Sequence, residues 1–432
     1  EGQREMIEKR IKEIVAGAIE ACVAEGALPR PGDFEVELSP PRSEAHGDFA
    51  TNVALVLAKG VGKKPREVAD AIAAKLGGKT HGIDKVEVAG PGFINFFVDP
   101  ALYIEGLLEI SDAGEKFGRV NLGGGKKLQV EFVSANPTGP LHIGHGRGAV
   151  YGDVLGNVMA AAGYEVTKEY YVNDAGNQIR TLGRSVWLRF RELEGEKVEF
   201  PADCYQGAYI ADIARDVKRA HEGKLKVMPE EEAIDFLGAL AGDRILEEIR
   251  RDLAETGVIH DTYFFESRLH TDAAVESATG KLKERGHIYE QEGATWFKTT
   301  AFGDDKDRVL KKSDGSLTYF ASDIAYHKNK YERGFERVID IWGADHGGYV
   351  ARMKAAVAAL GYDPATFDAV LIQLVNLMRG GEAVSMSTRS ATYETLEDVR
   401  REVGRDACRY FFLMRSHNAQ LDFDLDLARK QS

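Results

Sequence analysis

The fold of this chain is decided by one stretch, Leu128-Gln129-Val130-Glu131-Phe132-Val133-Ser134-Ala135-Asn136-Pro137-Thr138-Gly139-Pro140-Leu141-His142-Ile143-Gly144-His145. Residues 128–133 form a short β-rich run, which predicts a strand. A loop of Pro and Gly follows at 136–140, and apolar residues then recur at helical spacing over 143–162. Because a second β-rich run lies at 166–171, the stretch opens a strand, loop, helix, strand unit.

The same order returns later in the chain. Residues 338–342 and 369–375 are typical of strands, and residues 349–360 between them are typical of a helix. We therefore predict an α/β fold in which the two regions are halves of one doubly wound parallel sheet. Between them, at about 182–300, we predict an insertion that is helical over 182–253 and leans toward β structure near its end. Ligands of such sheets bind beyond the carboxyl ends of the strands.

The first part of the chain is typical of a separate small α+β domain. Apolar residues recur at helical spacing over 6–19, and Pro31-Gly32 then breaks the pattern. Further elements are predicted as helices at 53–57 and 68–76 and strands at 86–88 and 93–98. We divide the chain into a small α+β domain at 1–113, a linker rich in Gly and Lys at 114–127, the α/β domain at 128–392 and a helical junction at 393–432.

The composition is that of a globular protein. Of 432 residues, 44% are hydrophobic and 29% are charged, which argues against disordered, fibrous and membrane classes. We expect two or three domains and no membrane partner, since no run approaches the ~18 apolar residues of a membrane helix. Three isolated cysteines, Cys22, Cys204 and Cys408, suggest neither disulfides nor zinc and predict a reducing cytoplasm. The net charge of −13 neither supports nor defeats a nucleic-acid partner.

The loop and helix start after the first strand predict a nucleotide site. A helix N-terminus presents unpaired amides and a partial positive charge to phosphate, and Gly144 permits close approach to the backbone. His142 and His145 share a face and could donate hydrogen bonds to ATP phosphate as charge builds on pyrophosphate. A bare pair of histidines at this spacing could equally be surface residues or metal ligands. The flanking strand, loop and helix favour the nucleotide, and HExxH is absent.

The stretch around His142 closely resembles the His-Ile-Gly-His signature of class I aminoacyl-tRNA synthetases. Residues 130–136 resemble the arginine enzymes in particular, and residues 170–178, 319–327 and 342–349 agree. The resemblance runs essentially from end to end. It implies a Rossmann-like catalytic domain and a two-step reaction without a covalent enzyme intermediate. Arginine is first activated by ATP with Mg²⁺, and the arginyl group then passes to arginine tRNA. It further implies a monomer without a protein metal site, and a need for bound tRNA in the first step.

An arginine pocket must offer an acceptor for a planar guanidinium, and a fixed carboxylate beside a phenol does this well. Asp323 and Tyr319, four residues apart on a helical turn, are the predicted pair. By resemblance, Glu131 and Ser134 lie close by, and Asn136 and His346 contact the amino and carboxylate end of the substrate. From the residues alone, Tyr319 could instead be core packing and Asp323 a helix N-cap.

Gly343 and Asp345 are predicted ATP contacts. They belong to a Gly-Ala-Asp-His loop at a strand end, where Asp345 could position ribose or merely turn the chain.

The second signature of the family, Lys-Met-Ser-Lys, is expected on a loop after the last strand. Here the chain has Ser385-Met386-Ser387-Thr388-Arg389-Ser390, so Ser385 and Thr388 stand where the family has its two lysines. By resemblance, Met386 and Ser387 bind ATP, and Ser387 and Arg389 act in catalysis with His142 and His145. Without the lysines, either another cation substitutes, with Arg389 and Arg379 nearest, or activation is slow.

Both ends of the chain carry expectations. Residues 46–52 resemble the family's appended domain, which touches the tRNA elbow, so Asp48 and Asn52 are predicted tRNA contacts. A loop capping a helix, with Asp48 or Thr51 as the cap, is the alternative. Residues 421–426 resemble the entry into an anticodon-binding domain, which the chain is expected to lack, together with anticodon reading.

Two rivals to this interpretation stay open. One is a tRNA-independent nucleotidyltransferase or ligase of the same superfamily, which would have no reason to keep Tyr319, Asp323 and Glu131. The other is a non-catalytic, synthetase-derived protein that binds arginine and ATP or regulates, which the missing lysines favour.

Overall fold

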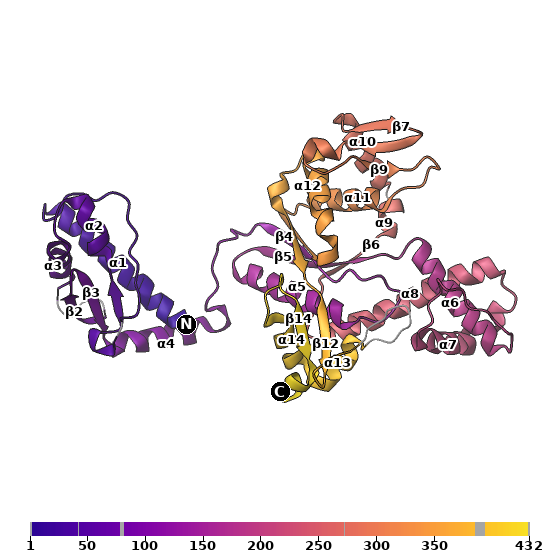
Figure 1. The fold of residues 1–432 in the computed structure, drawn as a ribbon, viewed down its shortest axis with the longest axis horizontal. Helices are drawn as coiled ribbons and strands as arrows, with labels where there is room; N and C mark the ends of the chain where they lie inside the picture. The colour runs from indigo at the N-terminus through magenta and orange to yellow at the C-terminus, as the bar shows by residue number, and fades with distance from the viewer. Residues whose placement is uncertain (1, 42, 78–81, 272, 385–393, 431–432) are drawn as a thin grey trace. The chain divides into compact units, whose positions relative to one another are not determined.

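The structure is a computed structural model that describes residues 2–41, 43–77, 82–271, 273–384 and 394–430. The chain divides into two compact units, Glu1–Arg119 and Val120–Ser432 (Figure 1). Each unit has its own buried core. No helix among the described residues is long and apolar enough to cross a membrane.

The first unit packs helices against a three-stranded antiparallel sheet of order β1-β3-β2. Its elements are α1 (Gly2–Ala24), β1 (Phe49–Thr51), α2 (Val53–Val61), α3 (Pro65–Leu76), β2 (Ile83–Ala89), β3 (Phe93–Val98) and α4 (Pro100–Ala113). The predicted helices and strands of this region are confirmed. Ile7, Ile11, Val15 and Ile19 recur every four residues on one face of α1 and are almost fully buried, which explains why the helix docks on this core.

The second unit is built on a five-stranded sheet of order β11-β10-β4-β5-β6, in which every pairing is parallel. Its strands are β4 (Lys127–Glu131), β5 (Glu165–Val172), β6 (Thr262–Phe265), β10 (Arg337–Gly343) and β11 (Phe367–Ile372). The predicted doubly wound sheet is confirmed. The halves meet where β4 lies beside β10, and this reversal of strand order is where such sheets bind their ligands.

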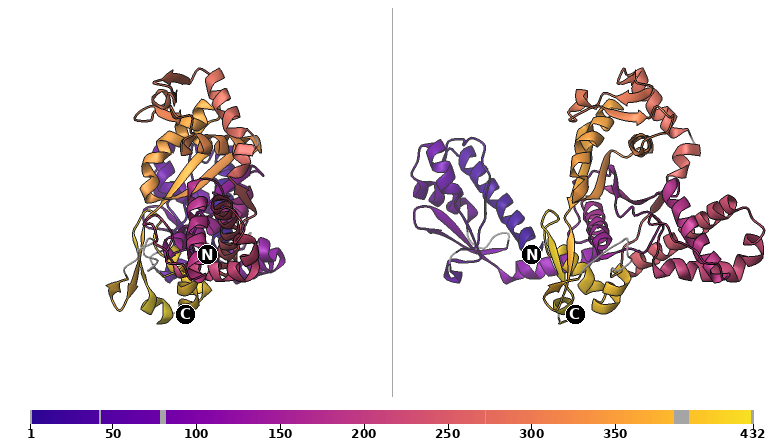
Figure 2. Two further views of the ribbon diagram at one scale, coloured as in Figure 1. Left: turned by 90° about the vertical axis from the view of Figure 1, so that its right-hand side faces the viewer. Right: turned by 45° about the vertical axis from the view of Figure 1, so that its right-hand side comes forward.

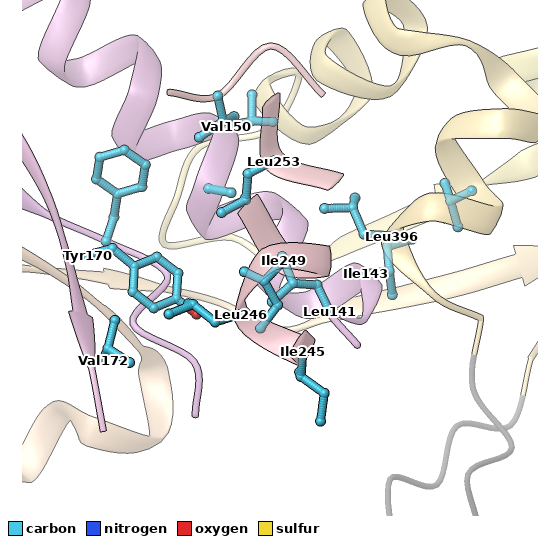
Figure 3. Packing of buried hydrophobic residues seen from close by; sticks show 14 of the residues in the cluster. Leu141, Ile143, Val150, Tyr170, Val172, Ile245, Leu246, Ile249, Leu253 and Leu396 are labelled. Atoms are coloured by element: carbon cyan, nitrogen blue, oxygen red, sulfur yellow. The ribbon is translucent and has the colours of Figure 1, made fainter. Parts of the chain in front are cut away.

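Three helices position the residues at this reversal. They are α5 (Ile143–Ala161), α11 (Tyr319–Glu332) and α12 (Val350–Ala359), the last preceded by the 3₁₀ turn Ala344–Tyr349. The start of α5 is anchored by a buried apolar cluster, in which Leu141 and Ile143 lie with Ile249 and Leu396 (Figure 3). The amide of Leu396 also donates to the carbonyl of Leu141 at 2.8 Å, so the chain after the second signature is tied to the histidine turn.

The insertion begins as a group of three helices, α6 (Asn177–Leu193), α7 (Ala208–Leu225) and α8 (Glu230–Glu255). The backbones of α6 and α8 approach closely at Gly183, where a Cβ atom would lie 2.0 Å from the carbonyl oxygen of Ile234. The chain then returns to the main sheet as β6. After this come α9 (Ser267–Thr271), α10 (Ala274–Glu284) and a small antiparallel sheet of β7 (Ile288–Gln291), β8 (Ala294–Phe297) and β9 (Arg308–Lys311).

The end of the chain forms a third small sheet of order β13-β12-β14, covered by short helices (Figure 2). Its elements are β12 (Val375–Arg379), β13 (Glu382–Ala383), α13 (Leu396–Val403), α14 (Arg405–Leu413), β14 (Leu421–Asp424) and α15 (Leu425–Lys430). Helices α13 and α14 pack on α5, the helix that begins at the histidine turn.

Candidate active site

A cavity of about 910 Å³ opens at the junction of β4 and β10. All eleven described residues that the sequence assigns to ATP or arginine line it: Glu131, Ser134, Asn136, His142, Gly144, His145, Tyr319, Asp323, Gly343, Asp345 and His346. They come from the ends of two central strands, the start of α5, the start of α11 and the 3₁₀ turn after β10. The fold therefore brings together residues that are more than two hundred positions apart.

The histidine turn is held by its own backbone. His142 is the N-cap of α5, and its Nδ1 accepts a hydrogen bond from the amide of Gly144 at 3.1 Å. Nδ1 of His145 accepts from the amide of His142 at 3.3 Å, and the two rings stack with centroids 3.8 Å apart. Because both Nδ1 atoms accept, the proton of each neutral ring lies on Nε2. A Cβ atom on Gly144 would lie 2.9 Å from the ring of His142, so a larger residue here would displace that ring.

Burial keeps these rings neutral. Desolvation lowers the pKa of His142, and desolvation together with His142 lowers the pKa of His145 to about 3. Near neutral pH both rings are therefore hydrogen-bond donors through Nε2, rather than cations. This matches the predicted role of donating to phosphate oxygens.

The cavity also has an acidic part, called the acidic pole, where Asp323 and Glu131 present carboxylates. Asp323 lies in the second turn of α11, and its Oδ2 accepts a hydrogen bond from the hydroxyl of Tyr349. Burial raises the pKa of Asp323, and the bond from Tyr349 opposes this rise. A bound cation would stabilise the ionised carboxylate.

The alternatives of core packing for Tyr319 and a helix N-cap for Asp323 are wrong. Tyr319 is 72% exposed, so it is not part of the core. The N-cap of α11 is Thr318, so Asp323 does not cap the helix. Both side chains line the cavity, one turn apart.

Glu131 and Ser134 form a rigid corner at the end of β4. Glu131 is 8% exposed, and its Oε1 accepts from the Ser134 hydroxyl at 2.9 Å. The backbone turns sharply here, because Val133 and Ser134 have φ angles of 69° and 42°, which β-branched and other non-glycine residues rarely adopt. Such strain concentrates at functional sites, and here it turns Ser134 back toward Glu131.

The remaining cavity residues are less firmly held. The side-chain amide of Asn136 donates to Gln178 at 2.6 Å. Nε2 of His346 lies 3.5 Å from Asp345, and both side chains are more than half exposed. Asp345 both belongs to a tight 3₁₀ turn and lines the cavity.

The sequence interpretation missed several cavity residues. Tyr171, Asn173, Tyr326, Tyr349 and the segment 373–375 also line the cavity. Tyr349 lies in the stretch 342–349, and Tyr171 and Asn173 lie in the stretch 170–178. Both stretches resemble the family, but no role was predicted for these three residues. Residues 373–375 follow β11 and had no motif of their own.

The second signature, including Ser385, Met386, Ser387, Thr388 and Arg389, lies outside the described residues. Its neighbour Arg379 does lie within them. The guanidinium of Arg379 is bound by Glu402 at 2.8 and 3.0 Å and lies 3.5 Å from Glu394. Its charge is already compensated, which makes it a poor substitute for a signature lysine.

The predicted tRNA contacts belong to the first unit. Oδ2 of Asp48 accepts from the amide of Val98 at 2.8 Å, so Asp48 joins the loop to the end of β3 and does not cap a helix. Asn52 is the N-cap residue of α2 but makes no side-chain cap bond, whereas Thr51 accepts from the amide of Val53 at 3.2 Å. Of the two caps proposed from the sequence, Asp48 is wrong and Thr51 bonds the helix start.

A doubly wound parallel sheet with a stacked His-x-x-His turn at its reversal defines the catalytic domain of a class I aminoacyl-tRNA synthetase. Two family models match the chain: arginyl tRNA synthetase N terminal domain over residues 7–98, and tRNA synthetases class I (R), catalytic domain, over residues 109–412. The chain belongs to the arginyl-tRNA synthetase family, as its sequence resemblance indicated.

Individual relatives agree. The chain is 54% identical to an arginine–tRNA ligase of Syntrophotalea carbinolica, over 99% of this chain and 77% of the relative. It is 51% identical to one of Geobacter sp. (strain M21), with the same coverage. A putative arginyl-tRNA synthetase from Campylobacter jejuni superposes with a TM-score of 0.69 at 40% identity, covering 74% of this chain and 69% of that one.

The arginyl-tRNA synthetase of Thermus thermophilus superposes over 98% of this chain and 78% of its own, with a TM-score of 0.62. At 20% identity, this likeness supports the fold alone.

Proposed function

We propose that the cavity at the junction of β4 and β10 carries out the reaction of the family to which the chain belongs. The chain is an ATP-dependent arginine–tRNA ligase. The cavity is large enough for an amino acid and a nucleotide together, and its chemistry differs between its two poles.

The acidic pole carries this assignment. Asp323 presents a half-buried carboxylate one turn from the phenol of Tyr319, with Glu131 on the neighbouring wall. A planar guanidinium matches a carboxylate with two parallel hydrogen bonds, and its charge offsets the cost of burying that carboxylate. Asn136 and His346 are proposed to hold the amino and carboxylate end of arginine.

The histidine turn is proposed to bind the phosphates of ATP. The carboxylate of arginine attacks the α-phosphorus, the bond to the bridging oxygen breaks, and pyrophosphate leaves. Neutral His142 and His145 donate from Nε2 to phosphate oxygens on which negative charge grows. Gly144 keeps the backbone accessible, and Gly343 and Asp345 are proposed ATP contacts on the other side. The terminal ribose hydroxyl of tRNA then displaces AMP from the arginyl group.

We propose that Mg²⁺ enters with ATP. Magnesium retains water and binds phosphate oxygens readily, so it does not require a protein cage. Among the described residues no three His, Cys, Asp or Glu side chains are grouped to hold a metal ion. Neutral imidazoles are also poor magnesium ligands, so the donors at the histidine turn fit phosphate better than the metal.

The proposal has four further parts: the second signature, the tRNA contacts, the location and the oligomeric state. Met386, Ser387 and Arg389 are proposed to act on ATP through the second signature, and Asp48 and Asn52 to contact tRNA. We propose a cytoplasmic enzyme, in keeping with three unpaired, buried cysteines. A monomer is proposed because a single chain supplies the whole cavity.

Arginine-dependent exchange of pyrophosphate into ATP, with and without tRNA, tests this function. We expect exchange with arginine and with no other standard amino acid, and we expect Asp323→Ala to reduce kcat/KM for arginine by at least about a hundredfold, as loss of a buried charge partner should. The names of the relatives, all ligases, speak against a non-catalytic rival. Arginine binding without any exchange, even with tRNA present, would favour that rival.

A further inference from the structure

A fully buried lysine lies behind the acidic pole of the cavity. Lys330, on α11, is 0% exposed and does not line the cavity. Its Nζ donates to Oε2 of Glu131 at 2.5 Å and to Oδ1 of Asp340 at 2.7 Å. The two acids belong to different central strands, so Lys330 joins β4 to β10 at the reversal of the sheet.

The strand register explains why a cation is needed there. Glu131 and Asp340 are direct partners in the pairing of β4 with β10. Like charges directly opposite each other on neighbouring strands destabilise a sheet, and burial increases the effect. An ammonium bonded to both carboxylates removes this repulsion.

The second partner of Asp340 is a histidine, whereas the second partner of Glu131 is the neutral hydroxyl of Ser134. His327 approaches Asp340 through Nε2 at 2.9 Å, while its Nδ1 donates to the carbonyl of Asp323 at 2.8 Å. Although burial opposes it, Lys330 and His327 together lower the pKa of Asp340. For Glu131, burial outweighs the attraction of Lys330 and raises the pKa. Loss of Lys330 would therefore raise the pKa of Glu131 further.

The contacts of Glu131 also fix its orientation. One carboxylate oxygen accepts from Ser134 and the other from Lys330, and Ser134 in turn accepts from the amide of Tyr171 at 3.1 Å. With both oxygens held, the carboxylate cannot rotate away from the cavity wall.

We propose that Lys330 is a positioning residue for arginine, holding Glu131 ionised and oriented so that the substrate cation meets Glu131 and Asp323 together. This inference rests on the proposed function, because it takes the acidic pole as the arginine pocket. Lys330 itself does not line the cavity. It also bonds Asp340, which does line the cavity, but Asp340 keeps His327 as a partner when Lys330 is lost, so the effect on arginine is expected through Glu131.

Arg333 provides a matched control on the same helix. It is a partly buried cation at the C-cap of α11, three residues after Lys330, and it bonds Glu169 of β5 at 2.6 and 2.8 Å. Glu169 is fully buried and does not line the cavity. Loss of either cation leaves a buried carboxylate unpaired on a central strand. Lys330 bonds carboxylates that themselves line the cavity, whereas Arg333 bonds Glu169, which meets a cavity residue through the hydroxyl of Tyr326.

The test compares Lys330→Gln, Arg333→Gln, Glu131→Gln and the Glu131→Gln/Lys330→Gln double variant of the full chain in pyrophosphate exchange with tRNA. Glutamine keeps hydrogen-bond capacity but removes the charge. We expect Lys330→Gln to raise KM for arginine about tenfold or more and KM for ATP less than about twofold, the scale of one lost charged hydrogen bond. Arg333→Gln should lower thermal stability comparably without this split.

The double variant removes one charge of each sign, so it folds more readily than the single lysine variant. If Lys330 acts through Glu131, its KM for arginine equals that of Glu131→Gln, with no added effect. Additive effects, or equal changes in both KM values for Lys330→Gln, would overturn the inference. If Glu131→Gln itself leaves KM for arginine unchanged, the proposed arginine pocket fails instead.

Discussion

At the scale of single residues, burial decides which groups at this site carry charge. His142 and His145 are held neutral by desolvation, whereas Asp323 and Glu131 lie where an ionised carboxylate needs a cationic partner. The histidine turn can therefore donate hydrogen bonds to phosphate, and the acidic pole gains most from a cationic substrate. The two poles of the cavity suit the two ends of arginyl-adenylate.

The lowered pKa of His145 predicts a specific acid sensitivity. Its folded pKa is about 3 and its unfolded value is about 6.5, so between these limits the unfolded chain binds more protons. Stability therefore falls as pH drops below about 6.5. When the pH falls from 7 to 5, the unfolding free energy of the wild type should drop by about 1–2 kcal/mol more than that of His145→Asn.

Urea unfolding followed by tryptophan fluorescence measures this difference, since Trp187, Trp296 and Trp342 all lie in the second unit. His346→Asn, which removes a largely exposed histidine, controls for the substitution itself. Equal losses in the wild type and His145→Asn would show that His145 is not held neutral.

Residues of the site could be predicted from the sequence where they lie in a recognisable motif, but not where only a contact with a distant residue gives them their role. Glu131, Tyr319 and Asp323 were found because each lies in a stretch resembling the family. Lys330 and Asp340 were missed, because nothing local in the sequence shows that residues 131 and 340 are partners across two strands. Only the register of the sheet makes the lysine between them necessary.

At the scale of elements, the position of α5 depends on one buried arginine. Arg147 is 1% exposed, and its guanidinium donates to the carbonyls of Gln373, Ala419 and Ser416 at 2.8–2.9 Å and of Arg415 at 3.5 Å. It thereby joins the histidine helix to the segment 373–375, which lines the cavity, and to the turn after α14.

Arg147→Lys should weaken both stability and ATP binding. A lysine keeps the charge but cannot reach all four carbonyls, so about 2–3 kcal/mol of stability should be lost with the unsatisfied groups. We expect KM for ATP to rise at least about fivefold, because the wall at 373–375 loses its link to the histidine turn. Thermal unfolding and pyrophosphate exchange measure the two effects.

Arg409→Lys is the control for this link. Arg409 also ties α5 to the end of the chain, by bonding Asp153 at 2.7 Å and the carbonyl of Gly257 at 2.9 Å, but neither partner lines the cavity. It should lower stability without raising KM for ATP. A similar rise in KM for both variants would show that Arg147 has no particular role in the nucleotide site.

The crossing of α6 and α8 depends on a glycine. At Gly183, an added Cβ would meet backbone atoms of α8, which cannot move aside as a flexible side chain would. Gly183→Ala should therefore destabilise the second unit by about 2–4 kcal/mol despite the higher helix propensity of alanine. Gly223→Ala in α7, where nothing lies within 4 Å of the added atom, should stabilise by about 0.5–1 kcal/mol. Two variants of equal stability would contradict the close crossing.

Helices and strands with strong hydrophobic periodicity were predicted well from the sequence, whereas short elements and sharp bends that pair with them were not. The repeated strand and helix order gave the parallel sheet, because long apolar runs alternating with helical patterns leave few other arrangements. The short strand β6 was not foreseen in the main sheet, since four residues inside a polar insertion carry little periodic signal. The bend at Val133 and Ser134 was also missed, because no glycine marks it.

At the scale of the whole molecule, the chain consists of two units with separate cores. The second unit contains the cavity, and the first carries the residues proposed to contact tRNA. The net charge of −13 means that any attraction for tRNA must come from local groups, rather than from the protein as a whole. The proposed tRNA contacts of the first unit come from the family resemblance, because composition alone could not predict them.

The central claim is that one cavity holds arginyl-adenylate, with its guanidinium at Asp323 and its phosphate at the histidine turn. A crystal structure of the chain with a non-hydrolysable arginyl-adenylate analogue tests it most directly. We predict two guanidinium nitrogens within hydrogen-bond distance of the Asp323 carboxylate, and Nε2 of His142 or His145 within hydrogen-bond distance of the oxygens that replace phosphate. An analogue bound with its guanidinium away from Asp323 and Glu131 would contradict the account.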